Sequence, residues 1–293
     1  MARTPFRIAA IDVGTNSIHM IVVEAQRHGY RVIDKEKDMA QLGRDSLEGR
    51  PLTDDAIARG VAALRTMGEI ARRWKVSEIA AVATSAVREA PNRKLFLGAV
   101  KQEAGIDLKI ISGEEEADYI YRAVRSAIDF HGGTALSIDI GGGSVELIVG
   151  TSSEVYFTRS EPVGALRMAQ RFELESSASA ESIAECRKFV KKSLKKTLAE
   201  VASIGFDFSV GTSGTIVTLA SISHEGGDGA DEMTSGLTWL NRGKLHDLIE
   251  ILGPMTAEDR ASTFGFDPRR ASTIVAGAIV LETIMDRLHI SQI

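Results

Sequence analysis

The sequence has 293 residues, a formal net charge of −5, 44% hydrophobic residues and 26% charged residues. Its length allows two domains or one large domain, and its composition is typical of a globular protein. The negative balance gives no overall electrostatic reason to bind nucleic acid, so a site for any polyanion needs a local concentration of donors.

The single cysteine, Cys186, excludes an intramolecular disulfide and a cysteine-rich metal cluster. Because it lies in a charged helical pattern, we expect a surface or packing residue there and not a nucleophile. No apolar run approaches the length of a membrane span, and the opening residues MARTPFR do not resemble a signal peptide. We therefore expect a cytoplasmic protein that has neither a membrane nor a nucleic acid as its partner.

Short β-branched runs alternate with longer helical patterns along the first half of the chain. The first three runs are separated by glycine-bearing turns, which predicts antiparallel hairpins. Thr53 is a predicted helix cap, followed by Asp54 and Asp55 in the first helical turn. In chain order, the predicted elements are strands at 7–12, 17–25 and 30–34, a helix from Thr53, a strand at 78–84, a helix from Asn92 to Gly105, a strand at 107–112 and a helix from about Ser112.

The second half begins with the same order and adds helices toward its end. The predicted elements are strands at 135–141, 144–150 and 153–160, a charged helix from about Ala180 to Ile204, a strand at 206–211, helices capped by Asn241 and Thr256, and a helix from about Arg269 to Leu288. Residues 223–236 are rich in glycine and acidic side chains and predict a mobile loop. Strands followed by crossover helices, twice over, indicate an α/β fold with mixed sheets.

Two similar motifs end a predicted strand in each half of the chain. IDVGTNS, residues 11–17, and IDIGGGS, residues 138–144, align at a constant offset of 127 residues, the difference between Asp12 and Asp139. An offset near half of the chain length indicates a duplication. Two copies of one unusual motif further predict two similar domains that face one site.

Each motif joins an aspartate to a glycine-rich turn, a combination that suits phosphate. Glycines let consecutive backbone N–H groups converge on anionic oxygens, and serine adds a hydroxyl donor. A tight β-turn with a capping aspartate explains one such motif equally well, but a second aligned copy weakens that alternative. The chain has no GxxxxGK[ST] or GxGxxG pattern of a nucleotide-binding loop. The predicted phosphate-binding residues are Gly14, Thr15, Asn16 and Ser17 in the first turn, and Gly141, Gly142, Gly143 and Ser144 in the second turn.

A third turn, VGTSGT, follows a predicted strand and precedes an apolar helical run. A helix N-terminus offers free N–H groups and the positive end of the helix dipole, so an anion or a nucleotide can dock there. The candidate phosphate-binding residues of this third turn are Gly211, Thr212, Ser213 and Gly214.

Carboxylates beside the turns are candidate metal ligands. An aspartate at a strand end can hold Mg²⁺ directly or through water. Glu146 lies two residues beyond Ser144, on the same face of its strand, and from there it can share a metal with Asp139. We expect Asp12 to support this metal from the first copy.

As a set, the motifs closely resemble the exopolyphosphatase and guanosine pentaphosphatase (Ppx/GppA) family, within the superfamily of actin, sugar kinases and heat-shock-chaperone ATPases. The matching stretches are IDVGTNSIHMIV, ATSAVREA, ISGEEEA, IDIGGGSVEL and GTSGT, in this order, and FDPRRASTIVAGAIVLE, which matches a later helix of the family. The likeness extends from about Arg7 to the last residue. It implies two duplicated ribonuclease-H-like (actin-like ATPase) domains with mixed five-stranded sheets flanked by helices, and an active site in the interdomain cleft.

The domains expected from this resemblance are residues 1–124, a hinge at 125–132, and residues 133–293. Members of the family continue into a further strand and a GLREG-like segment, whereas this sequence ends at SQI. The resemblance therefore implies either a missing C-terminal part or a short variant of the family. Family members are often dimers, so a homodimer is one expected state.

Three consecutive glutamates in ISGEEEA offer candidates for a catalytic base. Glu114 and Glu115 are explained by a helix start, where acidic side chains cap N–H groups and favour the helix dipole. Glu116 differs because Ile120 and Val124 follow it at four-residue intervals, which places it at the end of the buried face. The resemblance independently selects Glu116 as the base that activates water, and a structural role is the alternative.

Two further side chains are candidates for the same site. Arg88 follows a strand where a loop can bring it to the cleft, and its guanidinium can bind phosphate bidentately. A surface salt bridge with Glu89 is the alternative. His19 occupies the position equivalent to Glu146, and packing explains it as well as catalysis does.

The predicted charged helix also carries a basic row, which includes Arg187 and Lys196. A solvated helix face explains this row, as do an interface and a track for a long polyanion that extends from the cleft. The candidate track residues, called the basic surface below, are Lys188, Lys191, Lys192 and Lys195.

Together these features predict a Mg²⁺-dependent phosphoanhydride hydrolase. The resemblance implies inorganic polyphosphate or guanosine pentaphosphate as the substrate, and the basic row favours polyphosphate, cut from its end to release orthophosphate. A small-molecule kinase would use the same turns but transfer phosphate to an acceptor. A non-catalytic sensor of guanosine polyphosphates would bind without turnover, which the joint presence of Glu116, Asp139 and Glu146 argues against.

Overall fold

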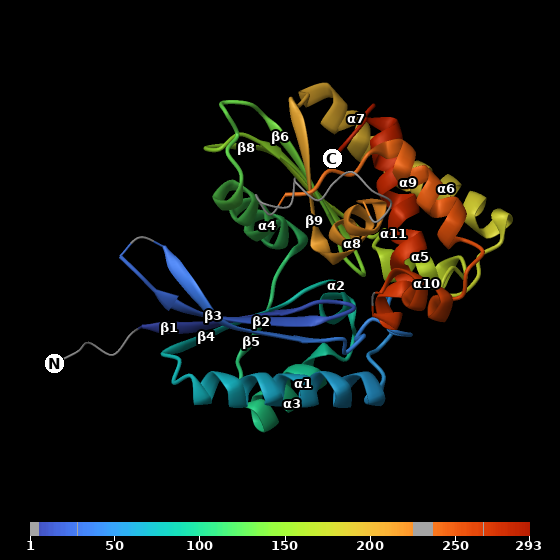
Figure 1. Ribbon diagram of the computed structural model, residues 1–293. Coiled ribbons are helices and arrows are strands. Elements are labelled where there is room, and N and C mark those ends of the chain that lie inside the picture. Colours follow the sequence, from blue (N-terminus) through green and yellow to red (C-terminus); the bar gives the residue numbers. More distant parts are fainter. Residues whose placement is uncertain (1–5, 28, 225–236, 266) are drawn as a thin grey trace. The chain divides into compact units, whose positions relative to one another are not determined.

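A computed structural model of the chain describes residues 6–27, 29–224, 237–265 and 267–293. By their internal contacts, the residues divide into two compact units, Met1–Ser112 and Gly113–Ile293. Among the described residues, none of the helices combines the length and the apolar composition of a membrane-spanning segment. Each unit is built around one mixed sheet with helices packed on it (Figure 1).

The first unit holds a five-stranded sheet in the order β3-β2-β1-β4-β5. The predicted hairpins are confirmed, because β1 pairs antiparallel with β2 and β2 pairs antiparallel with β3. The strands β4 and β5 add in parallel after crossover helices, as expected of an α/β unit. The bounds are β1 Arg7–Val13, β2 Ile18–Ala25, β3 Tyr30–Asp38, β4 Glu78–Ala83 and β5 Leu108–Ile110.

Helices α1 (Asp54–Arg73) and α3 (Arg93–Ala104) pack together on one face of this sheet (Figure 1). Thr53 caps α1 as predicted, because its side chain accepts a hydrogen bond from the Ala56 N–H. At the end of α3, Gly105 takes a left-handed conformation with φ of 72°, which explains why the helix stops there. A short helix that the sequence pattern did not predict, α2 (Ser85–Glu89), follows β4.

The second unit repeats this strand order, with a sheet in the order β8-β7-β6-β9. Its first three strands form antiparallel pairs, and β9 pairs in parallel with β6, as β4 does with β1. The predicted fifth strand is not found among the described residues, because every later element that they contain is a helix. The bounds are β6 Ala135–Ile140, β7 Val145–Gly150, β8 Val155–Glu161 and β9 Phe208–Thr212.

Helices cover both faces of this second sheet, so β7 is buried along its whole length. One face carries α4 (Gly113–Ala127), whose buried side chains pack with Ala135 and Ile148 of the sheet. The other face packs on a larger core around α11 (Pro268–Arg287), which is buried along most of its length. The remaining helices are α5 Ala165–Arg171, α6 Ala180–Ser193, α7 Lys195–Ile204, α8 Ser213–His224, α9 Arg242–Leu252 and α10 Ala257–Phe264.

Some predictions for this unit need correction. The single helix expected from Ala180 to Ile204 is broken at Leu194 into α6 and α7, and α5 was not predicted. Helix α4 belongs by its contacts to the second unit, and the predicted hinge at 125–132 stays a prediction. Of the predicted mobile loop at 223–236, the first two residues end α8 and residues 225–236 lie outside the described residues.

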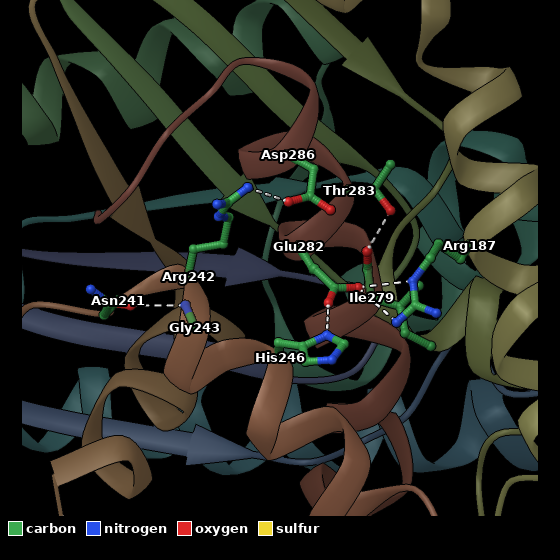
Figure 2. Close-up of polar contacts among 9 residues, drawn as sticks. All are labelled: Arg187, Asn241, Arg242, Gly243, His246, Ile279, Glu282, Thr283 and Asp286. Atoms are coloured by element: carbon green, nitrogen blue, oxygen red, sulfur yellow. Dashed lines mark hydrogen bonds and ion pairs between the residues drawn. The ribbon is translucent and has the colours of Figure 1, made fainter.

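Helices α6, α9 and α11 are joined by a polar cluster around Glu282 (Figure 2). The Glu282 side chain is buried and accepts hydrogen bonds from Arg187 Nε at 2.9 Å and His246 Nδ1 at 2.7 Å. Arg242 forms an exposed ion pair with Asp286 nearby.

Cys186 lies on α6, next to Arg187 in the chain, and its side chain is buried in the core of the second unit. Burial raises the pKa of its thiol to about 12. These observations confirm the predicted packing role.

Candidate active site

A row of polar side chains crosses the second sheet near the ends of its strands. Thr212, Asp139, Glu146 and Ser160 are successive cross-strand neighbours on β9, β6, β7 and β8, and such neighbours share one face of a sheet. Thr212 Oγ1 donates to Asp139 Oδ2 at 2.5 Å, and Ser160 Oγ donates to Glu146 Oε1 at 2.7 Å. The two predicted metal ligands therefore lie side by side, each held by a hydroxyl group.

Helix α4 covers the face that carries this row, and it brings Glu116 to the carboxylates. Ala117 and Val124 are buried against the sheet, whereas Glu114 and Glu115 are exposed and Glu116 is half-buried. The charge of Glu116 acts directly on Glu146. This confirms the expectation that Glu116 alone of the three glutamates lies at the end of the buried face.

Burial and mutual repulsion make the carboxylates of the row hard to ionise. Burial, followed by the charges of Glu116 and Asp139, raises the pKa of Glu146 to about 8, against the lowering effect of hydrogen bonds with Ser160 and Ser144. Burial also raises the pKa of Asp139, and the hydrogen bond from Thr212 partly offsets this. Ionisation of this row is therefore unfavourable without a counter-charge, and a bound cation would supply that charge.

The second turn follows β6 and presents free backbone donors beside the row. The Gly141 N–H closes the turn by donating to the Ser144 carbonyl at 3.0 Å. Within the described residues, the N–H groups of Gly142, Gly143 and Ser144 have no hydrogen-bond partner. Three consecutive free N–H groups form a nest of the kind that binds phosphate oxygens.

The third turn spans the end of β9 and the start of α8. Ser213 has φ of 77°, an uncommon value for a residue other than glycine, and its hydroxyl is buried with no partner in the described residues. The guanidinium of Arg270 lies directly against Gly214, since a Cβ built there would come within 2.2 Å of its Nη1. Sequence reasoning missed Arg270, although its position in a recognised family stretch was a usable signal. A cation beside a helix N-terminus creates a positively charged region that favours the binding of an anion.

The first unit holds the other copy of the motif in a different setting. Asp12 and His19 are cross-strand neighbours on β1 and β2, so His19 does occupy the position of Glu146. Both side chains are exposed, and Ser17 Oγ lies 2.7 Å from His19 Nε2. Exposure argues against a packing role for His19. The Gly14 N–H closes the first turn on the Ser17 carbonyl, and Asn16 Oδ1 is buried with no partner in the described residues.

Arg88 lies in the last turn of α2 and not on a loop. Its Nη1 donates to the Ile111 carbonyl at 3.0 Å, and its side chain is half-buried. Glu89 accepts a hydrogen bond from Ser85 at 2.7 Å. The predicted role of Arg88 on phosphate stays a prediction, as do the predicted roles of the first turn and Asp12. These residues belong to the first unit, whereas the carboxylate row belongs to the second.

The residues of the second unit fit Mg²⁺, although they do not form an all-protein cage. No group of three or more His, Cys, Asp or Glu side chains in the described chain is arranged to hold a metal by itself. Mg²⁺, however, prefers oxygen ligands and is usually held by one or two carboxylates together with water and substrate phosphates. Asp139 and Glu146 supply that carboxylate pair, and their unfavourable ionisation is the electrostatic state that a divalent cation relieves.

Two cavities lie beside β9 and contain none of these carboxylates. One, of about 670 Å³, is lined by residues that include Phe206, Asp207 and Leu288. The other, of about 210 Å³, is lined mainly by apolar side chains such as Ile216 and Trp239 and touches the third turn at Gly211.

A duplicated α/β fold with a phosphate nest beside clustered carboxylates defines a class of protein that acts on phosphate groups. The family comparison agrees, because the model of the Ppx/GppA phosphatase family matches residues 21–293. The chain belongs to the Ppx/GppA phosphatase family and is an enzyme of the phosphoanhydride hydrolase class.

Individual relatives cover almost the whole chain. It is 31% identical over 289 residues to exopolyphosphatase 1 of Mycobacterium leprae, covering 98% of this chain and 85% of that protein. Its fold matches a crystal structure of an exopolyphosphatase from Cytophaga hutchinsonii with a TM-score of 0.89 and 26% identity, covering 98% of this chain and 92% of the other. The Aquifex aeolicus family member gives a TM-score of 0.76 with 25% identity over 99% and 93% of the two chains.

Proposed function

We propose that this protein is an exopolyphosphatase, which hydrolyses the terminal phosphoanhydride bond of inorganic polyphosphate and releases orthophosphate. The observation that carries the proposal is the carboxylate row of Asp139 and Glu146, with Glu116 beside it and three free N–H groups in the adjoining turn. Relatives named as exopolyphosphatases support this substrate class.

In this proposal the second turn holds the terminal phosphate. The N–H groups of Gly142, Gly143 and Ser144 donate to its oxygens, which orients the phosphorus for in-line attack. The residues of the first turn and Arg88 offer further donors of the same kind, and their action on the same substrate is part of the proposal.

Glu116 acts as the general base. Its carboxylate accepts a proton from water as the water oxygen bonds to the terminal phosphorus, and the bridging P–O bond breaks. The electron pair of that bond stays on the departing chain, which is one phosphate shorter, and orthophosphate is the other product. Bound Mg²⁺, held by Asp139 and Glu146 with Asp12 in support, would neutralise charge on the phosphate oxygens.

The basic surface provides a path for the rest of a long substrate. Its four lysines are exposed, and within the described residues their side chains form no ion pair, whereas the neighbouring Arg187 is bound to Glu282. The far end of this surface adjoins the strand end near the second turn, because Thr197 of α7 donates to Glu161, which pairs with Val145. A chain of phosphates that leaves the turn would meet successive cations there.

Hydrolysis of guanosine pentaphosphate is the second candidate, and one observation favours it. The apolar cavity of about 210 Å³ beside the third turn, with Trp239 in its lining, has the size and chemistry to receive a nucleobase. A polyphosphate chain has no group that would use this cavity.

Phosphate release distinguishes these candidates. The purified protein is incubated with long-chain polyphosphate, guanosine pentaphosphate or ATP, each with Mg²⁺ and with a chelator. The proposal predicts Mg²⁺-dependent release that is fastest from polyphosphate. Faster release from guanosine pentaphosphate would favour the second candidate, and no release from any substrate by folded protein would contradict both.

A further inference from the structure

Three N–H groups of the second turn are free, whereas the glycine carbonyl groups on the other side of the turn all accept hydrogen bonds. The start of α5 donates to every glycine carbonyl of the turn. The backbone bonds are Ala165 N–H to Gly141 at 2.8 Å, Leu166 N–H to Gly142 at 2.9 Å, Arg167 N–H to Gly142 at 3.1 Å and Gly164 N–H to Gly143 at 3.3 Å. The first N–H groups of a helix have no partner within the helix, and here the turn supplies their acceptors.

Peptide geometry links these carbonyls to the phosphate-binding donors. In a trans peptide, the C=O of one residue and the N–H of the next point in opposite directions. Holding the carbonyls of Gly141, Gly142 and Gly143 against α5 therefore directs the N–H groups of Gly142, Gly143 and Ser144 away from it. These are the same three N–H groups that lack a partner in the described residues.

Arg167 adds a side-chain donor to this arrangement. Its side chain is buried, with 6% of the residue exposed, and its Nε donates to the Gly143 carbonyl at 2.8 Å. A charged donor gives a stronger hydrogen bond than a neutral one. Burying a guanidinium carries a desolvation penalty, so its placement under the turn indicates a positional requirement.

Gly164 lets α5 approach the turn this closely. Its φ of −66° is open to any residue, so backbone conformation does not demand glycine. A Cβ at this position would lie 2.5 Å from both the Gly143 carbonyl carbon and the Ser144 nitrogen. These are backbone atoms, and an alanine side chain would displace the turn by a large fraction of an ångström.

The first unit supports its own turn in the same way. Gly43 N–H donates to the Thr15 carbonyl and Gln41 N–H donates to the Asn16 carbonyl, each at 2.9 Å. In both units the donors come from the segment that follows the third strand of the sheet. The same support recurs although the two segments differ in sequence and only the second is helical.

We propose that residues 164–167, the supporting segment, position the second turn for phosphate binding, with Gly164 and Arg167 as positioning residues. This inference rests on the proposed function for its effect on the reaction. Neither residue touches substrate; each acts by fixing the direction of the three N–H groups. Because those donors are aimed at charge that develops on the phosphoryl oxygens, their misplacement lowers kcat more than it raises KM.

The test compares Gly164→Ala, Arg167→Lys and Arg167→Gln with two controls, Gly98→Ala and Arg242→Gln. Gly98 is an exposed helical glycine with open space around its Cβ position, and Arg242 is an exposed arginine paired with Asp286. Phosphate release is measured together with the amide spectrum of ¹⁵N-glycine-labelled protein during titration with tripolyphosphate. We expect Gly164→Ala to lower kcat/KM by about 100-fold and to abolish the shifts of Gly142 and Gly143, with both controls unchanged.

The arginine variants keep the test decisive if Gly164→Ala does not fold. Arg167→Lys, which retains the charge, should keep more of the kcat and more of the amide shifts than Arg167→Gln. The inference is overturned if folded Gly164→Ala, or Arg167→Gln in its place, retains wild-type kcat/KM and wild-type shifts. If wild type shows the shifts but releases no phosphate, the proposed hydrolase function fails while the positioning role stands.

Discussion

The first and second turns are copies of one motif that keep the same backbone support but differ in the side chains beside them. In both, a segment after the third strand holds the turn carbonyls, and the following N–H groups have no partner in the described residues. The cross-strand pair beside the turn is Asp12 with His19 in the first unit and Asp139 with Glu146 in the second. Duplication has thus kept the free backbone N–H groups of the turn and changed the charged side chains next to them.

Burial explains why this change matters chemically. In the first unit Asp12 and His19 are exposed, whereas in the second α4 covers the equivalent face and leaves Glu146 only 1% exposed. A buried carboxylate near two others ionises with difficulty, so its charged form gains most from a cation. The covering helix also carries Glu116, so the proposed base and the two carboxylates of the row all lie in the second unit.

The largest expected effect comes from exchanging the residue that differs between the copies. Glu146→Gln removes a proposed metal-binding carboxylate, so we expect Mg²⁺-dependent phosphate release to fall on the order of 10³-fold. His19→Gln removes an exposed side chain from the equivalent position and should lower the rate by less than about 10-fold. Equal losses in the two variants, measured under saturating polyphosphate, would show that the copies do not differ in the way proposed.

The raised pKa of Glu146 predicts a pH dependence of stability. Since its pKa rises from 4.5 to about 8 on folding, its contribution to the free energy of unfolding is complete below about pH 4.5 and is lost as the pH rises through about 8. The upper limit of this loss is about 5 kcal/mol. Urea unfolding without metal should show the slope in wild type and His19→Gln but not in Glu146→Gln, and Mg²⁺ should reduce it. A slope that persists in Glu146→Gln would assign it to another group.

The basic surface gives a smaller effect that depends on substrate length. Replacing Lys188, Lys191, Lys192 and Lys195 by glutamine should raise KM for long-chain polyphosphate by about 10-fold at low salt. KM for tripolyphosphate, which ends within the turn, should not change. An equal rise for both substrates would indicate a general electrostatic effect and would contradict a track.

The cluster around Glu282 should affect stability without affecting either turn (Figure 2). Glu282→Gln leaves Arg187 without its charged partner, so we expect the free energy of unfolding to fall by about 1–3 kcal/mol. The hydrogen bond to Glu282 raises the pKa of His246, so the part of stability that this pair gives is lost as the pH rises through that pKa. Asp286→Asn, at an exposed pair, is the control and should cost less than about 1 kcal/mol. A loss of kcat in folded Glu282→Gln would contradict this separation.

Much of the fold and of the site was predictable because it depends on residue types with strong local signals. The hairpins, the caps at Thr53, Asn241 and Thr256, and the end of α3 at Gly105 follow from apolar periodicity, side-chain acceptors and the left-handed conformation of glycine. Glu116 was distinguished from its neighbours by four-residue spacing, and its partial burial agrees. Asp139 was selected at a strand end, and Glu146 because it lies two residues beyond Ser144 on the same face of its strand; the two are cross-strand neighbours.

The supporting segment could not be predicted, and the reason is physical. It acts through backbone N–H groups, which every residue except proline provides, and α5 has only 7 residues, too few for a periodic pattern. Gly164 is required by the approach of a segment more than 20 residues away in the chain, which no local pattern reports. Similarly, no glycine or proline marks the break at Leu194, so one long helix was expected where the chain forms two.

The most direct test of the central claim is phosphate release from long-chain polyphosphate by wild type, Glu116→Gln and Glu115→Gln, with polyphosphate binding measured on the same samples. Glu115 is the exposed neighbour of the proposed base and is a matched control. We expect release by wild type, a loss of about 10²–10⁴-fold in Glu116→Gln, and a change of less than about threefold in Glu115→Gln, with binding retained in all three proteins. Wild-type rates in Glu116→Gln would contradict the role of Glu116 as the base, and binding without release in wild type would contradict hydrolysis.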